Sequence, residues 1–437
     1  MRTSFVFDAN RCTGCQACEL ACTIENGLEP EAGWRRVHTF NDRRLPDVPL
    51  FHLSLACNHC AEPACIEACP ALAYTRDTQT GAVLIDQDKC IGCRYCSWAC
   101  PYDAPRFDSR SGVMTKCTFC NDRLHQGKRP ACAELCPTAA LRVEPLPEER
   151  ITNHVEGFPQ SGLRPAIRIV PPRGNRLEPN VVSPRTPIEP RVRLGSEWPL
   201  ALFTFLGASL FATAAAAAIG GPAVPVIAFV AVAAVAMALG SAHLGRKRRA
   251  WRAVLGLRTS WLSREIVFFS SFVAVETLRR ARYPDSSAAE IVSLLLGLAA
   301  LFSMDRVYRY AVRARPHPPH SSGVLLTALF IAAALSGQAV AIVILATVKL
   351  VFYAARKIGR AASGDPVRPA VTAARLLAGF VLPAGLRLWA PATPPEIAIG
   401  LLLLGELIDR LEFYSELDFE SPARRMALDL DRRRRSA

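Results

Sequence analysis

The sequence predicts two unlike halves, an α+β domain built around clustered cysteines and an all-α polytopic transmembrane bundle of about eight helices. All 16 cysteines lie between Cys12 and Cys136, and long apolar runs dominate the chain after Trp198. Crowded cysteines indicate a bound cofactor, and apolar runs of about 20 residues indicate membrane spans. We expect a cysteine-rich domain at 1–145, a Pro-rich extended segment or linker at 146–197, a transmembrane anchor domain at 198–415 and a charged C-terminal tail at 416–437.

The formal net charge of +14 does not predict a nucleic-acid partner. The arginines fall in loops between apolar segments, where membrane orientation explains them better. The chain opens with Met-Arg-Thr-Ser-Phe-Val-Phe-Asp, which has neither an apolar signal core nor a twin-arginine pair. We therefore expect no export address in the chain itself.

The cysteines form four groups of four, with the patterns CxxCxxCxxxC, CxxCx4CxxxCP, CxxCxxCxxxCP and CxxCx11CxxxCP. In such patterns three close thiolates hold one cubane iron–sulfur cluster, while the fourth reaches a neighbouring cluster. The groups are Cys12, Cys15, Cys18 and Cys22; Cys57, Cys60, Cys65 and Cys69; Cys90, Cys93, Cys96 and Cys100; and Cys117, Cys120, Cys132 and Cys136. Because the groups use every cysteine, the sequence predicts four complete [4Fe-4S] clusters.

Two other uses of the cysteines fit less well. Adjacent CxxC pairs make poor disulfide staples, and structural zinc has no use for the third cysteine of each group. Each pair of groups should form a ferredoxin-like unit of short helices and hairpins, such as a hairpin turn at Thr78–Gly81 before a strand at Ala82–Asp86. Since these elements bury little core, we expect the first 145 residues to fold only with iron and sulfide.

Four runs carry a family resemblance: CTGCQACELAC, CNHCAEPAC, CIGCRYCSWACPYDAPRFD and MTKCTFCNDRLHQGKRPACAELCP. Together, over roughly residues 1–180, they resemble the four-cluster electron-transfer subunit of the dimethyl sulfoxide reductase family of molybdoenzymes. In that family the first group pairs with the fourth, and the second with the third. The resemblance implies clusters held by Cys12, Cys15, Cys18 and Cys136; by Cys117, Cys120, Cys132 and Cys22; by Cys57, Cys60, Cys65 and Cys100; and by Cys90, Cys93, Cys96 and Cys69.

Eight transmembrane spans are expected in the apolar half. The apolar run at 322–356 is about 52 Å long as one helix, too long for a hydrocarbon core of about 30 Å, so we expect a break at Ser336–Gln338. Prolines between residues 145 and 190 exclude long helices before the first span. The expected spans are 199–219, 224–242, 263–280, 289–304, 322–337, 339–356, 372–389 and 396–413.

The positive charges around these spans predict their orientation. On the side shared with the cysteine-rich domain, the loops after spans two, four and six hold 14 Lys or Arg, whereas the other side holds four. By the positive-inside rule, the cysteine-rich domain lies on the cytoplasmic side of the inner membrane. Relatives of this kind can instead be exported folded with a catalytic partner that has the twin-arginine signal.

The apolar half shows a looser resemblance. The stretches EWPLALFT from Glu197, SWLSRE from Ser260 and GELIDRLEFY from Gly405 are similar to the eight-helix quinol-oxidising anchor of the same family. The loop Pro316–His320 departs from that pattern. By position, the resemblance implies that His243 and Glu265 form the quinone/quinol site, where proton release needs a base. The alternatives are ordinary helix-end roles, with Glu265 in a first turn capped by Ser263 and His243 at a helix C-terminus.

Two functions follow. The first is an oxidoreductase subunit that relays electrons through four clusters between the quinone pool and a separate molybdopterin-containing catalytic chain. That complex would be either dimethyl sulfoxide reductase-like or sulfite dehydrogenase-like. The second is a membrane-bound conduit or docking scaffold for a soluble redox partner, without a molybdenum subunit. No residue of this chain is expected to contact the terminal substrate.

Overall fold

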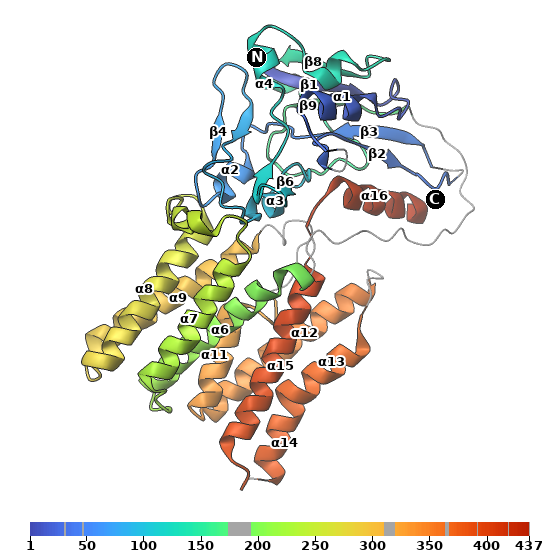
Figure 1. Cartoon of the computed structure of the whole chain (residues 1–437). Coiled ribbons are helices and arrows are strands. Elements are labelled where there is room, and N and C mark those ends of the chain that lie inside the picture. The colour runs from blue at the N-terminus through green and yellow to red at the C-terminus, as the bar shows by residue number, and fades with distance from the viewer. Residues whose placement is uncertain are drawn as a thin grey trace. The chain divides into compact units, whose positions relative to one another are not determined.

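The computed structural model describes residues 1–29, 32–45, 48–173, 194–309, 320–362, 367–390, 392–417 and 419–436. The chain divides into two compact units (Figure 1). The cysteine unit contains residues 1–189, 248–259 and 419–437, and the helical unit contains residues 190–247 and 260–418. Two short segments after residue 189 therefore belong to the cysteine unit. The predicted loop segment 310–315 with Arg313 and Arg315, most of the Pro316–His320 loop and much of the Pro-rich stretch lie outside the described residues.

Among its described residues, the cysteine unit contains one three-stranded sheet and three small hairpins. The sheet has the order β8-β1-β9, with β1 antiparallel to β8 and parallel to β9. Arg2 pairs with Leu146, so the strand that follows the fourth cysteine group lies beside the first strand of the chain. The strands are β1 (Arg2–Asp8), β2 (Arg36–Phe40), β3 (Phe51–Leu55), β4 (Tyr74–Arg76), β5 (Val83–Ile85), β6 (Arg106–Asp108), β7 (Val113–Thr115), β8 (Leu141–Leu146) and β9 (Ile167–Val170).

The predicted hairpin before the third cysteine group is confirmed. Strands β4 and β5 pair antiparallel, with Arg76 opposite Val83. The turn holds Gly81 at φ +74°, which glycine adopts without steric cost, and the Asp77 carboxylate accepts the backbone N–H groups of Gln79 and Thr80.

Short helices carry the third cysteine of each group, and the fourth lies within the helix in α1 and at or just past the helix end in the other groups. In the cysteine unit α1 packs against α5 and α2 packs against α3. This arrangement brings the first group to the fourth and the second group to the third. The helices are α1 (Ala17–Glu25), α2 (Ala64–Ala68), α3 (Tyr95–Ala99), α4 (Asn121–His125), α5 (Ala131–Glu134), η2 (Glu148–Arg150) and, in the C-terminal segment, α16 (Pro422–Ser436).

The helical unit is an all-α array, and each of the eight predicted spans falls on one of its helices or helix runs. Its helices are α6 (Leu194–Ala218), α7 (Val226–Ala242), α8 (Trp261–Arg282), α9 (Ser287–Val307), α11 (Val324–Leu335), α12 (Ala339–Ala362), α13 (Pro369–Leu376), the π-helical turn η4 (Leu377–Val381), α14 (Leu382–Trp389) and α15 (Pro395–Glu416). The helix η3 (Lys247–Val254) leads from α7 into the cysteine unit.

Four of the described helices are long and apolar enough to cross a membrane: α6, α9, α12 and the run Pro369–Trp389. Helix α7 makes a fifth if it is counted with η3, from which it is bent by 103°. Helix α11 has 12 residues, and α8 and α15 carry several charged side chains. The apolar helices thus support a membrane domain, while the number of eight spans stays a prediction.

The predicted break between spans five and six is confirmed. Helix α11 ends at Leu335, Gly337 adopts φ +69°, and α12 begins at Ala339. The N–H groups of Gly337 and Gln338 bond back to Ala334 and Ala333, as in a glycine-terminated helix. Helix α12 then continues to Ala362, six residues past the predicted end at 356, for a reason given below.

Candidate functional site

Each CxxC pair begins with the same backbone turn. The residue before the second cysteine has a left-handed conformation in all four groups: Gly14 (φ +71°), His59 (φ +41°), Gly92 (φ +71°) and Phe119 (φ +64°). In three groups the N–H of this residue points at the first sulfur, 3.5 Å from Cys57, 3.4 Å from Cys90 and 3.4 Å from Cys117. Backbone donors aimed at thiolate sulfurs fit a group that brings negative charge.

One set of four cysteines surrounds a common cavity. Cys69, Cys90, Cys93 and Cys96 line it together with apolar residues that include Ile85, Ile91 and Met114. In the part of the chain that the structure describes, no three His, Cys, Asp or Glu side chains are close enough to hold a single metal ion. Four thiolates spaced around an apolar cavity instead suit a multi-iron cube.

Electrostatic contacts join cysteines of different groups elsewhere in the cysteine unit. Burial raises the pKa of Cys60, and Cys57, Cys100 and Cys65 raise it further. Burial likewise raises the pKa of Cys12, with added repulsion from Cys18, Cys136 and Cys15. Burial raises the pKa of Cys22 to about 11, with contributions from Cys132 and Cys120, and Cys22 in turn acts on Cys117. These contacts bring cysteines of the first group close to those of the fourth, and Cys60 of the second group close to Cys100 of the third, while the assignment of each cysteine to a cluster stays a prediction.

Two buried cations lie between these sets. The Lys116 ammonium donates to the Cys57 sulfur at 3.4 Å, to the Cys117 carbonyl at 2.8 Å and to the Val83 carbonyl. Burial lowers the pKa of Arg35, but the thiolates of Cys132, Cys18 and Cys117 outweigh it and raise the pKa overall. Both cations offset the negative charge that thiolates and clusters concentrate here.

His59 is a third buried polar side chain beside these thiolates. Its Nδ1 accepts the N–H of Val83 at 3.0 Å, and burial together with Lys116 holds its pKa well below the usual value. A neutral ring whose Nδ1 accepts must carry its proton on Nε2. Nε2 lies 3.7 Å from the Cys117 sulfur, so His59 donates to this thiolate.

The segment 248–259 binds the cysteine unit beside the cavity described above. Arg249 donates to the carbonyls of Gln87 (2.7 Å) and Cys90 (3.2 Å), and the Gly256 N–H donates to the Pro70 carbonyl at 2.9 Å. A Cβ at Gly256 would stand 2.9 Å from the Cys69 carbonyl oxygen, so only glycine permits this approach. Segment 248–259 is joined by the chain to α7 at one end and to α8 at the other.

In the helical unit, Glu265 is buried on α8. The helix starts at Trp261 after the N-cap Ser260, so Ser263 is not the cap and Glu265 lies beyond the first turn. The charged groups that act on it are Arg410 and Asp305. Arg410 stacks over Tyr308 and Tyr414, whose hydroxyls bond to each other. A buried carboxylate beside a cation and two phenols can exchange a proton with a ligand.

His243 is the C-cap of α7 and is partly exposed. The helix-end position expected for this residue is thus observed. Its joint role with Glu265 stays a prediction.

Comparison with known proteins bears on both units. Residues 48–145 match the family described as "4Fe-4S dicluster domain", and residues 196–360 match "DMSO reductase anchor subunit (DmsC)". A component of the anaerobic dimethyl sulfoxide reductase of Escherichia coli is 44% identical over 154 residues, which cover 33% of this chain and 75% of that relative. A component of the sulfite dehydrogenase of Allochromatium vinosum is 35% identical over 203 residues, covering 40% and 85%.

The protein belongs to the dimethyl sulfoxide reductase family. A component of the tetrathionate reductase of Salmonella typhimurium, 36% identical over 41% of this chain and 71% of its own length, is a further relative. Within the family, this chain joins the iron–sulfur subunit and the membrane anchor in one polypeptide. It is an electron-transfer and membrane-anchor subunit of an oxidoreductase.

Sequence reasoning missed one feature of this family member, a set of charged side chains inside the helical unit. Arg356, Lys357 and Arg360 were expected in a loop, yet they lie within α12 and pair with carboxylates of α15. This pairing explains why α12 extends past residue 356. Ionisable residues within predicted spans, such as Lys349 and Arg375, were the available signal, because charges at membrane depth are rarely without a role.

Proposed function

We propose that the chain relays electrons between the membrane quinone pool and a separate molybdopterin-containing chain through four [4Fe-4S] clusters. The arrangement of all 16 cysteines in four groups of four along the sequence carries this proposal. The ligands are Cys12, Cys15, Cys18 and Cys136; Cys117, Cys120, Cys132 and Cys22; Cys57, Cys60, Cys65 and Cys100; and Cys90, Cys93, Cys96 and Cys69. When bound, each cluster supplies one-electron transfer.

In this relay, the cluster held by Cys69, Cys90, Cys93 and Cys96 exchanges electrons with the quinone site on the membrane side. Segment 248–259 supports this assignment, because it covers the backbone beside Cys69 and Cys90 and its ends continue into α7 and α8. Those helices bear the proposed quinone-site residues His243 and Glu265.

The cluster at the opposite end of the relay is the one held by Cys12, Cys15, Cys18 and Cys136, of which Cys15 is exposed. Exposed apolar side chains accompany this set: Leu20 and Ile24 on α1, and Leu135 beside Cys136, each at least 60% exposed. An apolar patch next to an accessible cluster ligand suits a protein partner that exchanges electrons there. The catalytic chain is the partner that the relatives' names suggest.

The quinone half-reaction takes place at Glu265 and His243. Oxidation of a quinol releases two protons with two electrons, so a base must face the ring oxygens. Glu265 is buried near both Arg410 and Asp305, so the Asp305 carboxylate still compensates the charge of Arg410 when Glu265 accepts a proton. In quinone reduction the same groups supply the protons, and both directions of electron flow are compatible with this site.

The chain is a multi-pass inner-membrane protein of eight spans with the cysteine unit on the cytoplasmic side. In the sequence, 14 positive charges flank the spans on that side, against four on the other side. The excess supports the orientation.

Purification of the intact complex tests the relay. Four filled sites predict roughly 16 iron atoms per chain. A large molybdopterin-containing chain that co-purifies supports the proposal, while a fully loaded chain that co-purifies only with a small soluble redox protein supports the alternative scaffold function. Roughly eight iron atoms or fewer in a fully folded chain would contradict the four-cluster relay.

Lys116→Met should lower the midpoint potential of the cluster held by Cys57, because a buried positive charge favours the reduced, more negative state. A unit charge a few ångströms away shifts the potential by an amount on the order of 100 mV at an effective dielectric constant near 20. Redox titration followed by EPR measures the shift. Lys128→Met, which removes an exposed lysine of the same unit, should leave all potentials unchanged; equal potentials in both variants would show that Lys116 does not tune the cluster.

A further inference from the structure

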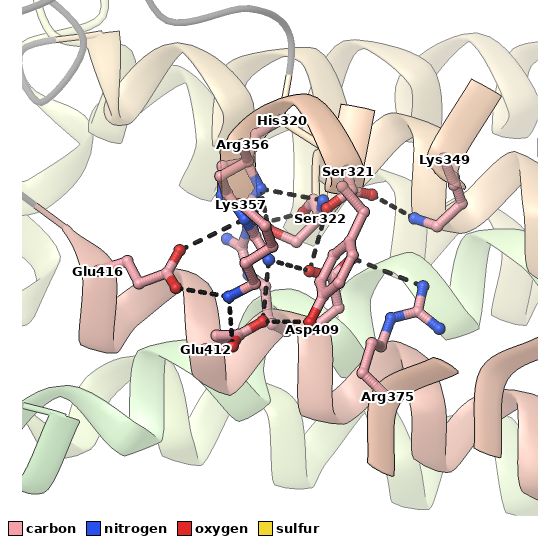
Figure 2. Close-up of polar contacts among 12 residues, drawn as sticks. His320, Ser321, Ser322, Lys349, Arg356, Lys357, Arg375, Asp409, Glu412 and Glu416 are labelled. Carbon is pink, nitrogen blue, oxygen red and sulfur yellow. Dashed lines mark hydrogen bonds and ion pairs between the residues drawn. The ribbon is translucent and has the colours of Figure 1, made fainter. Parts of the chain in front are cut away.

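Charged side chains of α12, α13 and α15 meet inside the helical unit and form a continuous set, which we call the ion-pair ladder. Figure 2 shows most of its members pointing toward one another from these helices. Its cations are Lys349, Arg356, Lys357, Arg360 and Arg375, and its carboxylates are Glu406, Asp409, Glu412 and Glu416.

The inner end of the ladder is fully buried. Glu406 contacts Lys349 at 2.8 Å and Arg375 at 2.7 Å, and all three side chains are 0% exposed. Gly379 and Gly405 lie in direct backbone contact, which lets α15 approach η4 and brings Arg375 to its partners. Small residues at this crossing therefore fix the ladder's inner end.

The outer end reaches the surface of the helical unit. Glu416 contacts Arg356, Lys357 and Arg360, and the side chain of Arg360 is 21% exposed. From Glu406 to Glu416 the ladder follows α15 for about 15 Å, half of a membrane core. Helix α15 ends at Glu416, and Phe419 already belongs to the cysteine unit, so the open end lies where the chain leaves the helical unit.

The cations of the outer part are shared between carboxylates. Arg356 lies 3.0 Å from Asp409, 3.0 Å from Glu412 and 3.3 Å from Glu416, and Lys357 contacts both Glu412 and Glu416. In a one-to-one buried pair, protonating the carboxylate leaves its cation uncompensated. When one carboxylate takes up a proton, a shared cation still contacts a second, ionised carboxylate. A proton can therefore reside on Asp409, Glu412 or Glu416 in turn.

The ladder continues toward Glu265. Asp409 accepts from Ser321 at 3.1 Å, and the neighbouring Arg410 donates to the Ser322 carbonyl at 3.0 Å while it acts on Glu265. His320 bridges Ser322 and Arg356. Polar groups therefore link the surroundings of Glu265 with the carboxylates of the ladder.

We propose that the ion-pair ladder is a proton-transfer route between Glu265 and water at the Glu416 end, with Asp409, Glu412 and Glu416 as the proton carriers. The proposal rests on the quinone site proposed above. When a quinol is oxidised, its two O–H bonds break, its two electrons go singly to the iron–sulfur clusters and then to an external oxidant, and its two protons pass along these carboxylates to water. Quinone reduction takes up two protons by the same route.

Glu412→Gln tests the route, because glutamine keeps the shape of the side chain and cannot carry a proton. The full chain in lipid nanodiscs, with its clusters oxidised beforehand, is mixed with menadiol as quinol, and cluster reduction is followed by stopped flow. We expect at least a fivefold slower reduction, a larger H2O/D2O rate ratio, and recovery on addition of acetate as a diffusible proton carrier. Glu416→Gln, at the more exposed end, should behave in the same way if Glu412→Gln fails to fold.

Glu276→Gln is the matched control. Glu276 is a buried carboxylate of the same unit that accepts from Arg279, Arg280 and Ser293, away from the ladder. Its variant should reduce the clusters at the normal rate. Unchanged kinetics in Glu412→Gln, or an equal slowing in both variants without recovery by acetate, would overturn the route and leave the ladder a structural brace. Loss of rate in Glu265→Gln alone would refute the route while preserving the quinone site, whereas normal rates in Glu265→Gln would refute the site itself.

Discussion

Replacing Cys100 with serine should destroy or convert the cluster bound by Cys57, Cys60 and Cys65 and leave the cluster at Cys90, Cys93 and Cys96 intact. Cys100 belongs to the third group in sequence, yet in the structure it acts on Cys60 and Cys65 of the second group. The cause is the end of α3, where Cys100 adopts an extended backbone at the C-cap and leaves the helix that holds Cys96. A serine hydroxyl is a poor substitute for a thiolate ligand of iron.

EPR spectra of the reduced chain, combined with a separate analysis of the iron content, measure this outcome. Loss of one ligand predicts a drop of about one iron if a three-iron cluster remains, or about four if the cluster is lost. Cys96→Ser is the matched control, because Cys96 lines the cavity of the other set and its loss should affect that cluster instead. An intact spectrum for the Cys57 site in Cys100→Ser, with damage at the Cys90 site, would show that each group binds its own cluster.

Several features of both units could be predicted from the sequence because their determinants are local. Cysteine spacing, the turn at Gly81 and the break at Gly337 depend on a few neighbouring residues, and the β4–β5 hairpin and the end of α11 follow from them. Membership in the iron–sulfur and anchor families was likewise predictable from the motifs. The cavity shared by Cys69, Cys90, Cys93 and Cys96 could not be predicted, because it depends on how the second and third cysteine groups pack together.

Two features could not be predicted, and both depend on tertiary contacts. The segments 248–259 and 419–436 are rich in arginine and resemble a loop and a tail, yet they belong to the cysteine unit. Their contacts use backbone carbonyls, such as the Pro70 oxygen, or ion pairs such as Arg433 with Glu156, which no sequence pattern marks. The same holds for the ion-pair ladder, since the charge of Lys349 is tolerable only beside Glu406, 57 residues further along the chain.

Glu265→Gln should slow quinol-driven reduction of the clusters by roughly 100-fold or more, the range expected when a positioned base is lost. Glutamine preserves the volume of the side chain and its contacts in the buried site, but it cannot take the quinol proton. The clusters should still be reduced at the normal rate by dithionite, which donates electrons without a quinone site. A difference between the two reductants therefore isolates proton acceptance from electron transfer along the relay.

The pH dependence of the same reaction gives a second measurement. If Glu265 is the base, quinol-driven reduction in the native chain rises as this group loses its proton with increasing pH, and the rise disappears in Glu265→Gln. Glu265→Asp, which keeps the carboxylate on a shorter side chain, should recover part of the rate and the pH dependence. Glu276→Gln, on the same helix and also buried, should retain both. A selective loss of rate with quinol, with normal reduction by dithionite, would support Glu265 as the base of the quinone site. Quinol kinetics in Glu265→Gln equal to those of the native chain would show that Glu265 is not part of the quinone site.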